Sequence, residues 1–201
     1  MTDFHNKTPS LDSHWRAIIL FGRNVASYKF ALAKSLLDLA DQETTTLELA
    51  DLAPKFSQHI CDHLKQEDKQ STSKTSKFLD SCRSFNAGKI SQDQLIQETT
   101  RKEFNNVIDA FHIVNQDELG VRFFEDNRKN RGGITLTDNI FKLKETVQGF
   151  SLRNEVEARW RLVETAWSLN IGRNLIGIQA DFDSDTLYVD SVRRVNITSS
   201  R

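Results

Sequence analysis

The sequence predicts a mostly helical α+β fold. Apolar residues recur every three or four positions over most of the chain up to Phe111, which is the spacing of amphipathic helices. Farther along, residues 121–137 and 178–189 change to short strand-like runs around polar turns. Thirteen Phe and three Trp supply bulky side chains for a core. We therefore expect a helical N-terminal part, followed by two β-hairpins and a long helix in the C-terminal half.

The N-terminal part contains signals for successive helices. Asp12 or Ser13 can cap a first helix that begins near His14. Gly22 suits the left-handed position that ends a helix, and Asn24 can cap the second helix. The apolar side chains that recur along the second helix are Val25, Tyr28, Leu32, Leu36 and Leu39.

A third helix is predicted after the polar run at residues 44–46. Its apolar residues extend from Leu49 to Leu64, but proline is disfavoured inside a helix and fits its first turn. We therefore place the start of this helix at Ala53, with Pro54 in the first turn.

A polar segment follows the third helix. Residues 65–77 contain no large apolar side chain, which predicts a mobile surface loop. A short helix is expected from Phe78 to near Gly88. Ser91 and Gln94 have the spacing of a capping box, so a further helical region should begin there.

Two hairpins are predicted in the C-terminal half. Val121–Phe124 and Ile134–Thr137 have strand-like composition, and the basic segment 127–133 between them forms the tip of a wing-like hairpin. The second hairpin should join Ile178–Phe182 to Thr186–Val189 through a short acidic turn.

Between the hairpins, Leu152–Leu169 has one apolar face and predicts a long helix. Glu155 with Arg159 and Glu157 with Arg161 are four residues apart, which is typical of a solvated charged face.

The chain is long enough for one domain or two small, tightly packed subdomains. The predicted parts are a helical subdomain at 1–66, a polar loop at 67–77, a helical and wing-hairpin subdomain at 78–191, and a linker at 192–201.

Composition excludes several classes of protein. The net charge of −1 argues against a wholly basic nucleic-acid coat. Cys61 and Cys82 are too few for a disulfide scaffold and fit reduced thiols. No apolar run approaches the roughly 20 residues that span a bilayer, and Met1–Lys7 lacks the apolar core of a signal peptide. We expect a cytoplasmic protein without a membrane partner, and a homo-oligomer or a partner protein remains open.

Residues of metal-binding type occur, but without a complete site. His59 and His63 are four residues apart on one expected helix and could face one metal, although further ligands are needed. The acidic-x-lysine triplet Glu67–Lys69 falls in the polar loop, whereas a nuclease site belongs on a rigid element.

The acidic turn of the second hairpin resembles the start of a calcium loop. Asp181, Asp183 and Asp185 have the right spacing, but Thr186 and Val192 stand where such a loop needs Gly and Glu. We therefore predict no catalytic residue, no metal and no cofactor in this chain.

Cationic side chains are the candidates for ligand binding. Cations on a two-stranded wing commonly contact DNA phosphates, while a plain solvated loop is the alternative for the same residues. The candidate nucleic-acid-binding residues are Arg23, Lys29, Lys34, Arg128, Lys129, Arg131, Arg193 and Arg194. Lys29 and Lys34 lie off the apolar stripe of the second helix.

Four segments resemble the N-terminal, non-catalytic region of bacterial proteins that carry an HNH endonuclease module farther along the chain. These segments are Trp15–Leu37, Asn106–His112, Phe123–Phe124 and Glu155–Trp167. The resemblance implies an accessory region of a restriction or phage-defence DNA endonuclease, which holds DNA, a partner chain or both beside the catalytic module. It also implies that a divalent metal belongs only to that module.

We further expect the native polypeptide to continue past Arg201 into the HNH module, with Val192–Arg201 as the connection. The alternative is a stand-alone protein-interaction or regulatory domain with no role in DNA binding. One continuous cationic face would favour DNA binding, and scattered charges would favour the alternative.

Overall fold

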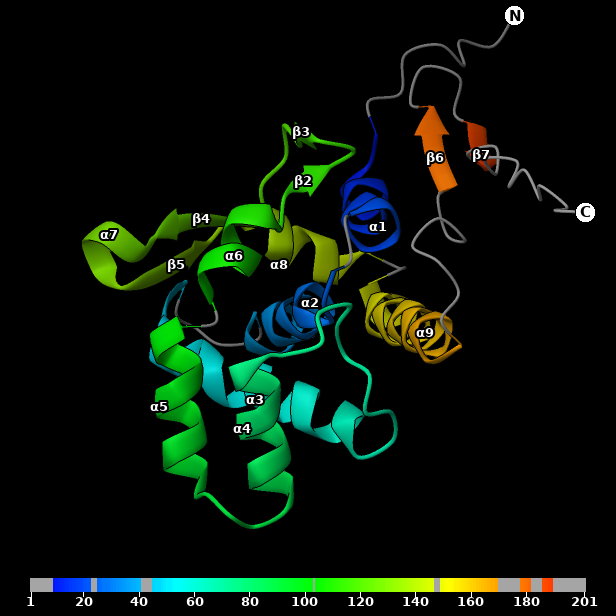
Figure 1. Cartoon of the computed structure of the whole chain (residues 1–201). Coiled ribbons are helices and arrows are strands. Elements are labelled where there is room, and N and C mark those ends of the chain that lie inside the picture. The colour runs from blue at the N-terminus through cyan, green and yellow to red at the C-terminus, as the bar shows by residue number, and fades with distance from the viewer. Residues whose placement is uncertain are drawn as a thin grey trace, which may run out of the picture.

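The protein has the mostly helical α+β fold that the sequence predicts (Figure 1). The computed structural model describes residues 9–22, 25–40, 45–102, 104–146, 149–169, 178–181 and 186–189. In chain order, the elements are α1 (Leu11–Phe21), α2 (Tyr28–Leu39), β1 (Thr46–Glu48), α3 (Leu49–Leu64), α4 (Lys77–Asn86), α5 (Gln92–Lys102), α6 (Phe104–Ala110), β2 (Ile113–Val114), β3 (Asp117–Glu118), β4 (Phe124–Asn127), α7 (Arg128–Arg131), β5 (Gly133–Leu136), α8 (Asp138–Glu145), α9 (Gly149–Ser168), β6 (Ile178–Asp181) and β7 (Thr186–Val189).

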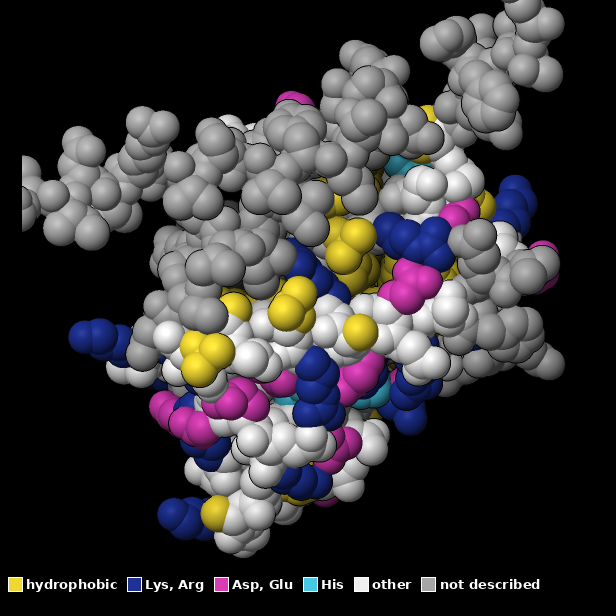
Figure 2. Space-filling model, turned by 90° about the vertical axis from the view of Figure 1, so that its right-hand side faces the viewer, with side chains coloured by type: hydrophobic (Ala, Val, Ile, Leu, Met, Phe, Trp, Pro, Cys, Tyr) yellow, Lys and Arg dark blue, Asp and Glu magenta, His cyan; other side chains and the backbone are white. Residues whose placement is uncertain are grey.

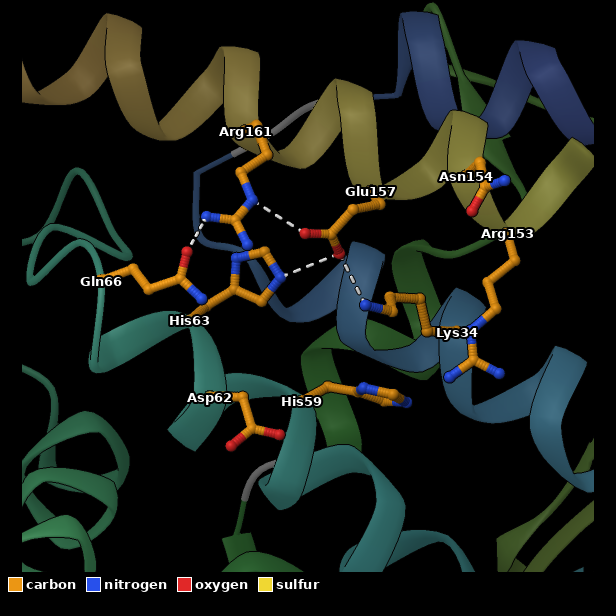
Figure 3. Close-up of a pocket in the computed structure, with 9 residues that line it drawn as sticks. All are labelled: Lys34, His59, Asp62, His63, Gln66, Arg153, Asn154, Glu157 and Arg161. Carbon is orange, nitrogen blue, oxygen red and sulfur yellow. Dashed lines mark hydrogen bonds and ion pairs between the residues drawn. The ribbon is translucent and has the colours of Figure 1, made fainter.

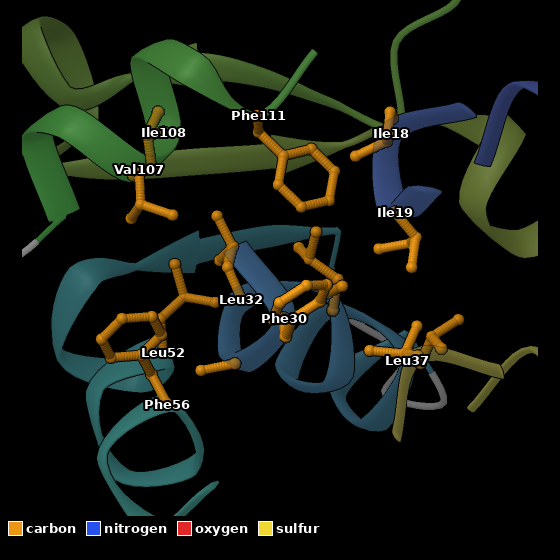
Figure 4. Close-up of a cluster of buried hydrophobic side chains, with 14 of the residues drawn as sticks. Ile18, Ile19, Phe30, Leu32, Leu37, Leu52, Phe56, Val107, Ile108 and Phe111 are labelled. Atoms are coloured by element: carbon orange, nitrogen blue, oxygen red, sulfur yellow. The ribbon is translucent and has the colours of Figure 1, made fainter. Parts of the chain in front are cut away.

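Helix α2 lies at the centre of the fold, where α3, α6, α8 and α9 pack against it. Because neighbours surround it, α2 is buried on nearly all sides, and Phe30, Leu32 and Leu36 are each 0% exposed. Figure 4 shows α1 contributing Ile18 and Ile19 to the same cluster of buried side chains. One hydrophobic core joins residues on both sides of the polar loop at 67–77.

A three-stranded antiparallel sheet holds the first predicted hairpin. Its strand order is β1-β5-β4, with Leu47 opposite Ile134 and Phe124 opposite Leu136. The hairpin is therefore confirmed, but its strands lie a few residues from the predicted bounds, and β1 covers the second edge of β5. Strand β1 was not predicted, because it is only three residues long and follows a polar threonine run.

Close backbone contact explains Gly133 at the start of β5. A Cβ atom at this position would lie 2.0 Å from the Leu47 carbonyl oxygen and 2.7 Å from Glu48 Cα. Only glycine lets β1 and β5 approach this closely.

Several predicted boundaries are corrected. Helix α1 begins at Leu11 rather than near His14. Helix α3 begins at Leu49 rather than Ala53. The Asp51 carboxylate accepts a hydrogen bond from the Glu48 backbone N–H at 2.8 Å, and this capping box stabilises the earlier start. Pro54 is then inside the helix, as its sixth residue, and lacks the backbone N–H that would donate to the carbonyl of Ala50.

Other local predictions are confirmed. The capping box before α5 is present, with Ser91 N donating to Gln94 Oε1 at 2.8 Å and Gln94 N donating to Ser91 Oγ at 3.2 Å. Strands β6 and β7 pair as the second hairpin, although the turn at 182–185 and the proposed cap Asn24 lie outside the described residues. A small β2–β3 hairpin was not predicted, because Asn115 and Gln116 form its turn without a glycine.

The polar loop at 67–77 is more deeply packed than its composition indicates. Gln70 is 0% exposed, so the expectation of a purely surface loop is wrong at this residue. Ser27 N donates to the Gln70 carbonyl at 3.0 Å and Thr72 N donates to the Val25 carbonyl at 2.9 Å. These bonds fix the loop to the segment that leads into α2. Across the described part of the chain, no helix is long and apolar enough to cross a membrane.

Candidate functional site

Buried polar side chains connect α3 to α9, and His63 is their centre. His63 Nδ1 lies 2.6 Å from Glu164 Oε1, and His63 Nε2 lies 3.1 Å from Glu157 Oε2. The side chains of His63 and Glu164 are only 4% and 3% exposed. Both ring nitrogens of His63 therefore face carboxylate oxygens of α9.

Gln70 extends the same network toward α2. Its Nε2 donates to Glu164 Oε1 at 2.5 Å, and its Oε1 accepts from Ser27 Oγ at 2.5 Å and from Trp160 Nε1 at 3.0 Å. Both ends of the amide are thus satisfied in a fully buried position. This explains how a glutamine from a polar loop enters the core.

Glu157 gathers cations from two helices. Its carboxylate accepts from Lys34 Nζ at 2.6 Å and from Arg161 Nε at 2.8 Å. Burial raises the pKa of Glu157. The hydrogen bonds from Lys34 and Arg161, together with the electrostatic effect of His63, outweigh burial and lower the pKa to about 2. Glu157 therefore stays ionised throughout the neutral range.

Asp38 on α2 is a second shared carboxylate. It lies 3.0 Å from His59 Nε2 and forms an ion pair with Arg153. Burial and the positive charge of Lys34 lower the pKa of His59 to about 4, against the opposing effect of Asp38. His59 is therefore neutral near pH 7.

These groups border an open pocket between α3 and α9 of about 230 Å³ (Figure 3). All of its lining side chains are polar or charged. Asp62 and Glu157 supply carboxylates, and the others supply nitrogen donors. The lining residues are Lys34, His59, Asp62, His63, Gln66, Arg153, Asn154, Glu157 and Arg161.

The described residues do not form the metal site considered for His59 and His63. His59 and His63 both reach the pocket wall, but each faces a carboxylate from another helix. Within the described ranges, no group of three or more His, Cys, Asp or Glu side chains is placed to hold a metal. Asp183 and Asp185 of the acidic turn lie outside those ranges.

In the acidic-x-lysine triplet at 67–69, Asp68 and Lys69 bind other parts of the chain. Asp68 accepts from Arg83 Nε at 2.6 Å, and Lys69 Nζ donates to the Trp167 carbonyl at 2.6 Å. Cys61 and Cys82 are both buried and are not joined by a disulfide in this structure.

Two predicted DNA contacts, Lys29 and Lys34, have other roles in this structure. Lys29 is 4% exposed, its Nζ lies 3.5 Å from the Ile113 carbonyl oxygen, and burial lowers its pKa to about 8. The expectation that it lies outside the buried face is wrong, because α2 is covered on that side as well. Lys34 donates to Glu157 and lies 5.7 Å from the centre of the Trp160 ring.

The tip of the first hairpin is a single helical turn, α7. Arg128 anchors it, because its guanidinium forms ion pairs with Asp109 and, at 2.7 Å, with Asp126. The hydrogen bond to Asp126, with a smaller contribution from the one to Asp109, raises the pKa of Arg128 above its ordinary value. Lys129 and Arg131 are exposed, and neither forms an ion pair within the part of the chain that the structure describes.

The remaining predicted contacts, Arg23, Arg193 and Arg194, lie outside the described residues. Among the described members of the predicted set, only Arg128, Lys129 and Arg131 lie together, on α7. No family model, curated protein or solved structure matches this chain.

Proposed function

We propose that this chain is an accessory, DNA-positioning region of an HNH-type DNA endonuclease. One observation supports the DNA contact most directly: Lys129 and Arg131 are exposed on α7, at the end of a hairpin fixed in a three-stranded sheet. The nuclease assignment rests on the resemblance of the four segments described above.

The hairpin tip suits contact with a phosphate backbone. Arg128 is tied to Asp109 and Asp126, so it orients the tip, while Lys129 and Arg131 supply the charge. Such cations position a protein on DNA without selecting a sequence. Sequence selection and hydrolysis then belong to the nuclease module, which also holds the divalent metal, and we place this activity in the cytoplasm.

A salt titration of DNA binding tests the proposal. The affinity of the chain for a short labelled duplex is measured over a range of NaCl concentrations, for the wild type and for Lys129→Ala/Arg131→Ala. Loss of two phosphate contacts should weaken binding and flatten the log–log salt slope by up to about 1.8, which is about 0.9 per contact.

The matched control is Lys55→Ala/Arg101→Ala, which removes one exposed lysine and one exposed arginine from α3 and α5. The control should bind like the wild type. If the two double variants behave alike, the hairpin tip is not the DNA contact.

A protein-interaction domain is the second candidate, and the distribution of charge favours it. On the face shown in Figure 2, Lys and Arg side chains alternate with Asp and Glu instead of forming one cationic surface. Arg16 with Glu155 and Arg161 with Glu157 are examples of such neutralised pairs. Salt-insensitive or undetectable DNA binding, together with a stable oligomer in light scattering, would favour this candidate.

A further inference from the structure

The pocket between α3 and α9 has the chemistry of an anion site. Its volume of about 230 Å³ accommodates a small polar molecule, and no apolar side chain lines it. Its floor is buried, since His59 and His63 are 8% and 3% exposed. An apolar ligand would have to strip water from these groups without replacing their hydrogen bonds, so the pocket selects a polar ligand.

The carboxylates of this region are already neutralised by cations. Glu157 pairs with Lys34 and Arg161, Asp38 pairs with Arg153, and Asp62 pairs with Lys65. A metal ion would therefore compete with a resident cation at each of these three carboxylates. The lining nitrogen groups, by contrast, have donors to spare, because an ammonium carries three N–H groups and a guanidinium carries five.

Unused donors flank the pocket on two sides. Arg161 bonds to Glu157 through Nε and to Gln66 through Nη1, which leaves Nη2 without a described partner. Toward the other end, Asn154 is exposed, its side chain has no hydrogen-bond partner among the described residues, and Figure 3 shows it beside Arg153. Both residues line the pocket, so each can donate to an anion bound there.

We propose that this pocket binds a phosphate group, either as free inorganic phosphate or as the phosphate of a small organic monoester. A tetrahedral anion offers several acceptor oxygens to donors that approach from different directions, and arginine pairs well with it. This inference goes beyond the proposed DNA contact, since the pocket shares no residue with the hairpin tip.

The test uses the full 201-residue chain and titrates it by calorimetry with inorganic phosphate at constant ionic strength, with chloride as the reference anion. Phosphate should bind saturably with one site and chloride should not compete. Adenosine monophosphate and adenosine distinguish the two sources of the group. Tighter binding of the monophosphate than of inorganic phosphate assigns an organic monoester, and equal or weaker binding assigns free phosphate.

Asn154→Asp is the sharpest variant, because it places a negative charge at the pocket without breaking any described bond. It should weaken phosphate binding by about tenfold or more through like-charge repulsion. Asn106→Asp makes the same chemical change at an exposed position on α6 and should leave the affinity unchanged.

Arg153→Gln/Arg161→Gln should also lower the affinity, while Lys129→Ala/Arg131→Ala should keep it, which separates the pocket from the hairpin tip. Absence of saturable phosphate binding overturns the proposal. An equal loss of affinity in Asn154→Asp and Asn106→Asp overturns it as well, because it indicates nonspecific anion binding.

Discussion

The imidazole of His63 lies flat on the indole of Trp160, with ring centroids 3.4 Å apart and ring planes 3° from parallel. The stack connects α3 to α9 and turns both nitrogens of His63 toward carboxylates of α9. A stacked aromatic face and two charged hydrogen bonds thus act on the same ring, so His63 should be among the most sensitive positions in the protein.

His63→Ala should lower the free energy of unfolding by about 3 kcal/mol or more. The substitution removes the His63 ring from its stack on Trp160 and leaves the buried Glu164 carboxylate without its imidazole partner, and both losses in a buried setting are destabilising. Urea unfolding measures the change. Gln58→Ala, at an exposed position of the same helix, should alter stability by less than about 0.5 kcal/mol. Similar values for both variants would show that the network contributes little.

Gln70→Ala should cost about 2–3 kcal/mol, because Ser27, Trp160 and Glu164 each lose a partner in a buried setting. Chemical denaturation with Gln97→Ala as the exposed control checks the value. A loss as small as that of the control would mean that water replaces the amide at no cost.

His112 should make stability depend on pH. Its Nε2 accepts the Phe123 backbone N–H at 3.0 Å, and burial, assisted by the charges of Arg122 and Lys29, lowers its pKa to about 3. The ordinary pKa is 6.5, so between about pH 6.5 and 3 the unfolded chain binds a proton that the folded chain does not. Stability contributed by this group is therefore complete above that window and falls as the pH falls through it.

The variant His112→Gln keeps an acceptor for Phe123 but cannot titrate. Its unfolding free energy should decline less steeply than that of the wild type as the pH is lowered from 6.5 to 3, because one proton fewer is taken up on unfolding. Parallel pH profiles for the two proteins would exclude His112 as the source of the effect.

Gly133→Ala should destabilise the protein by about 1–3 kcal/mol, since the new Cβ would overlap backbone atoms of β1 that cannot rotate away. Gly120→Ala is the matched control, because no heavy atom lies within 4 Å of the Cβ that it adds. Thermal unfolding of both variants measures the difference. A stable Gly133→Ala protein would show that β1 does not pack against β5 as described.

Local sequence signals predicted elements whose stability is local. The capping box at Ser91 and Gln94 and the pairing of β6 with β7 follow from short-range spacing, and both are present. The length of α3 was underestimated, because Pro54 indicated a helix start more strongly than the Asp51 cap did. Burial of Lys29 was not predictable from α2 alone, since it depends on elements that pack around that helix from distant parts of the chain.

The candidate site was visible in the sequence only in fragments. The spacing of His59 and His63 predicted two histidines on one face of a helix. The pair Glu157–Arg161 was also expected and is present. Its interpretation as a solvated face was incomplete, because Glu157 also bonds to Lys34 and His63.

Two other residues of α9 depart from that interpretation more strongly. Glu155 binds Arg16 on α1 instead of Arg159, at 2.7 Å. Arg159 is 7% exposed and donates to the Leu20 carbonyl at 2.8 Å. Periodicity gives the spacing of charges along one helix, but not which neighbouring helix covers them.

The pairing of β1 with β5 has a consequence for the integrity of the chain. A proteolytic cut within the loop at 67–77 would place these two strands on different fragments, although they share three residue pairs in one ladder. Neither fragment could complete the sheet by itself, and each would carry an exposed part of the common core. A nicked chain should therefore remain associated under native conditions, separate only in denaturant, and reassemble when the two purified pieces are mixed.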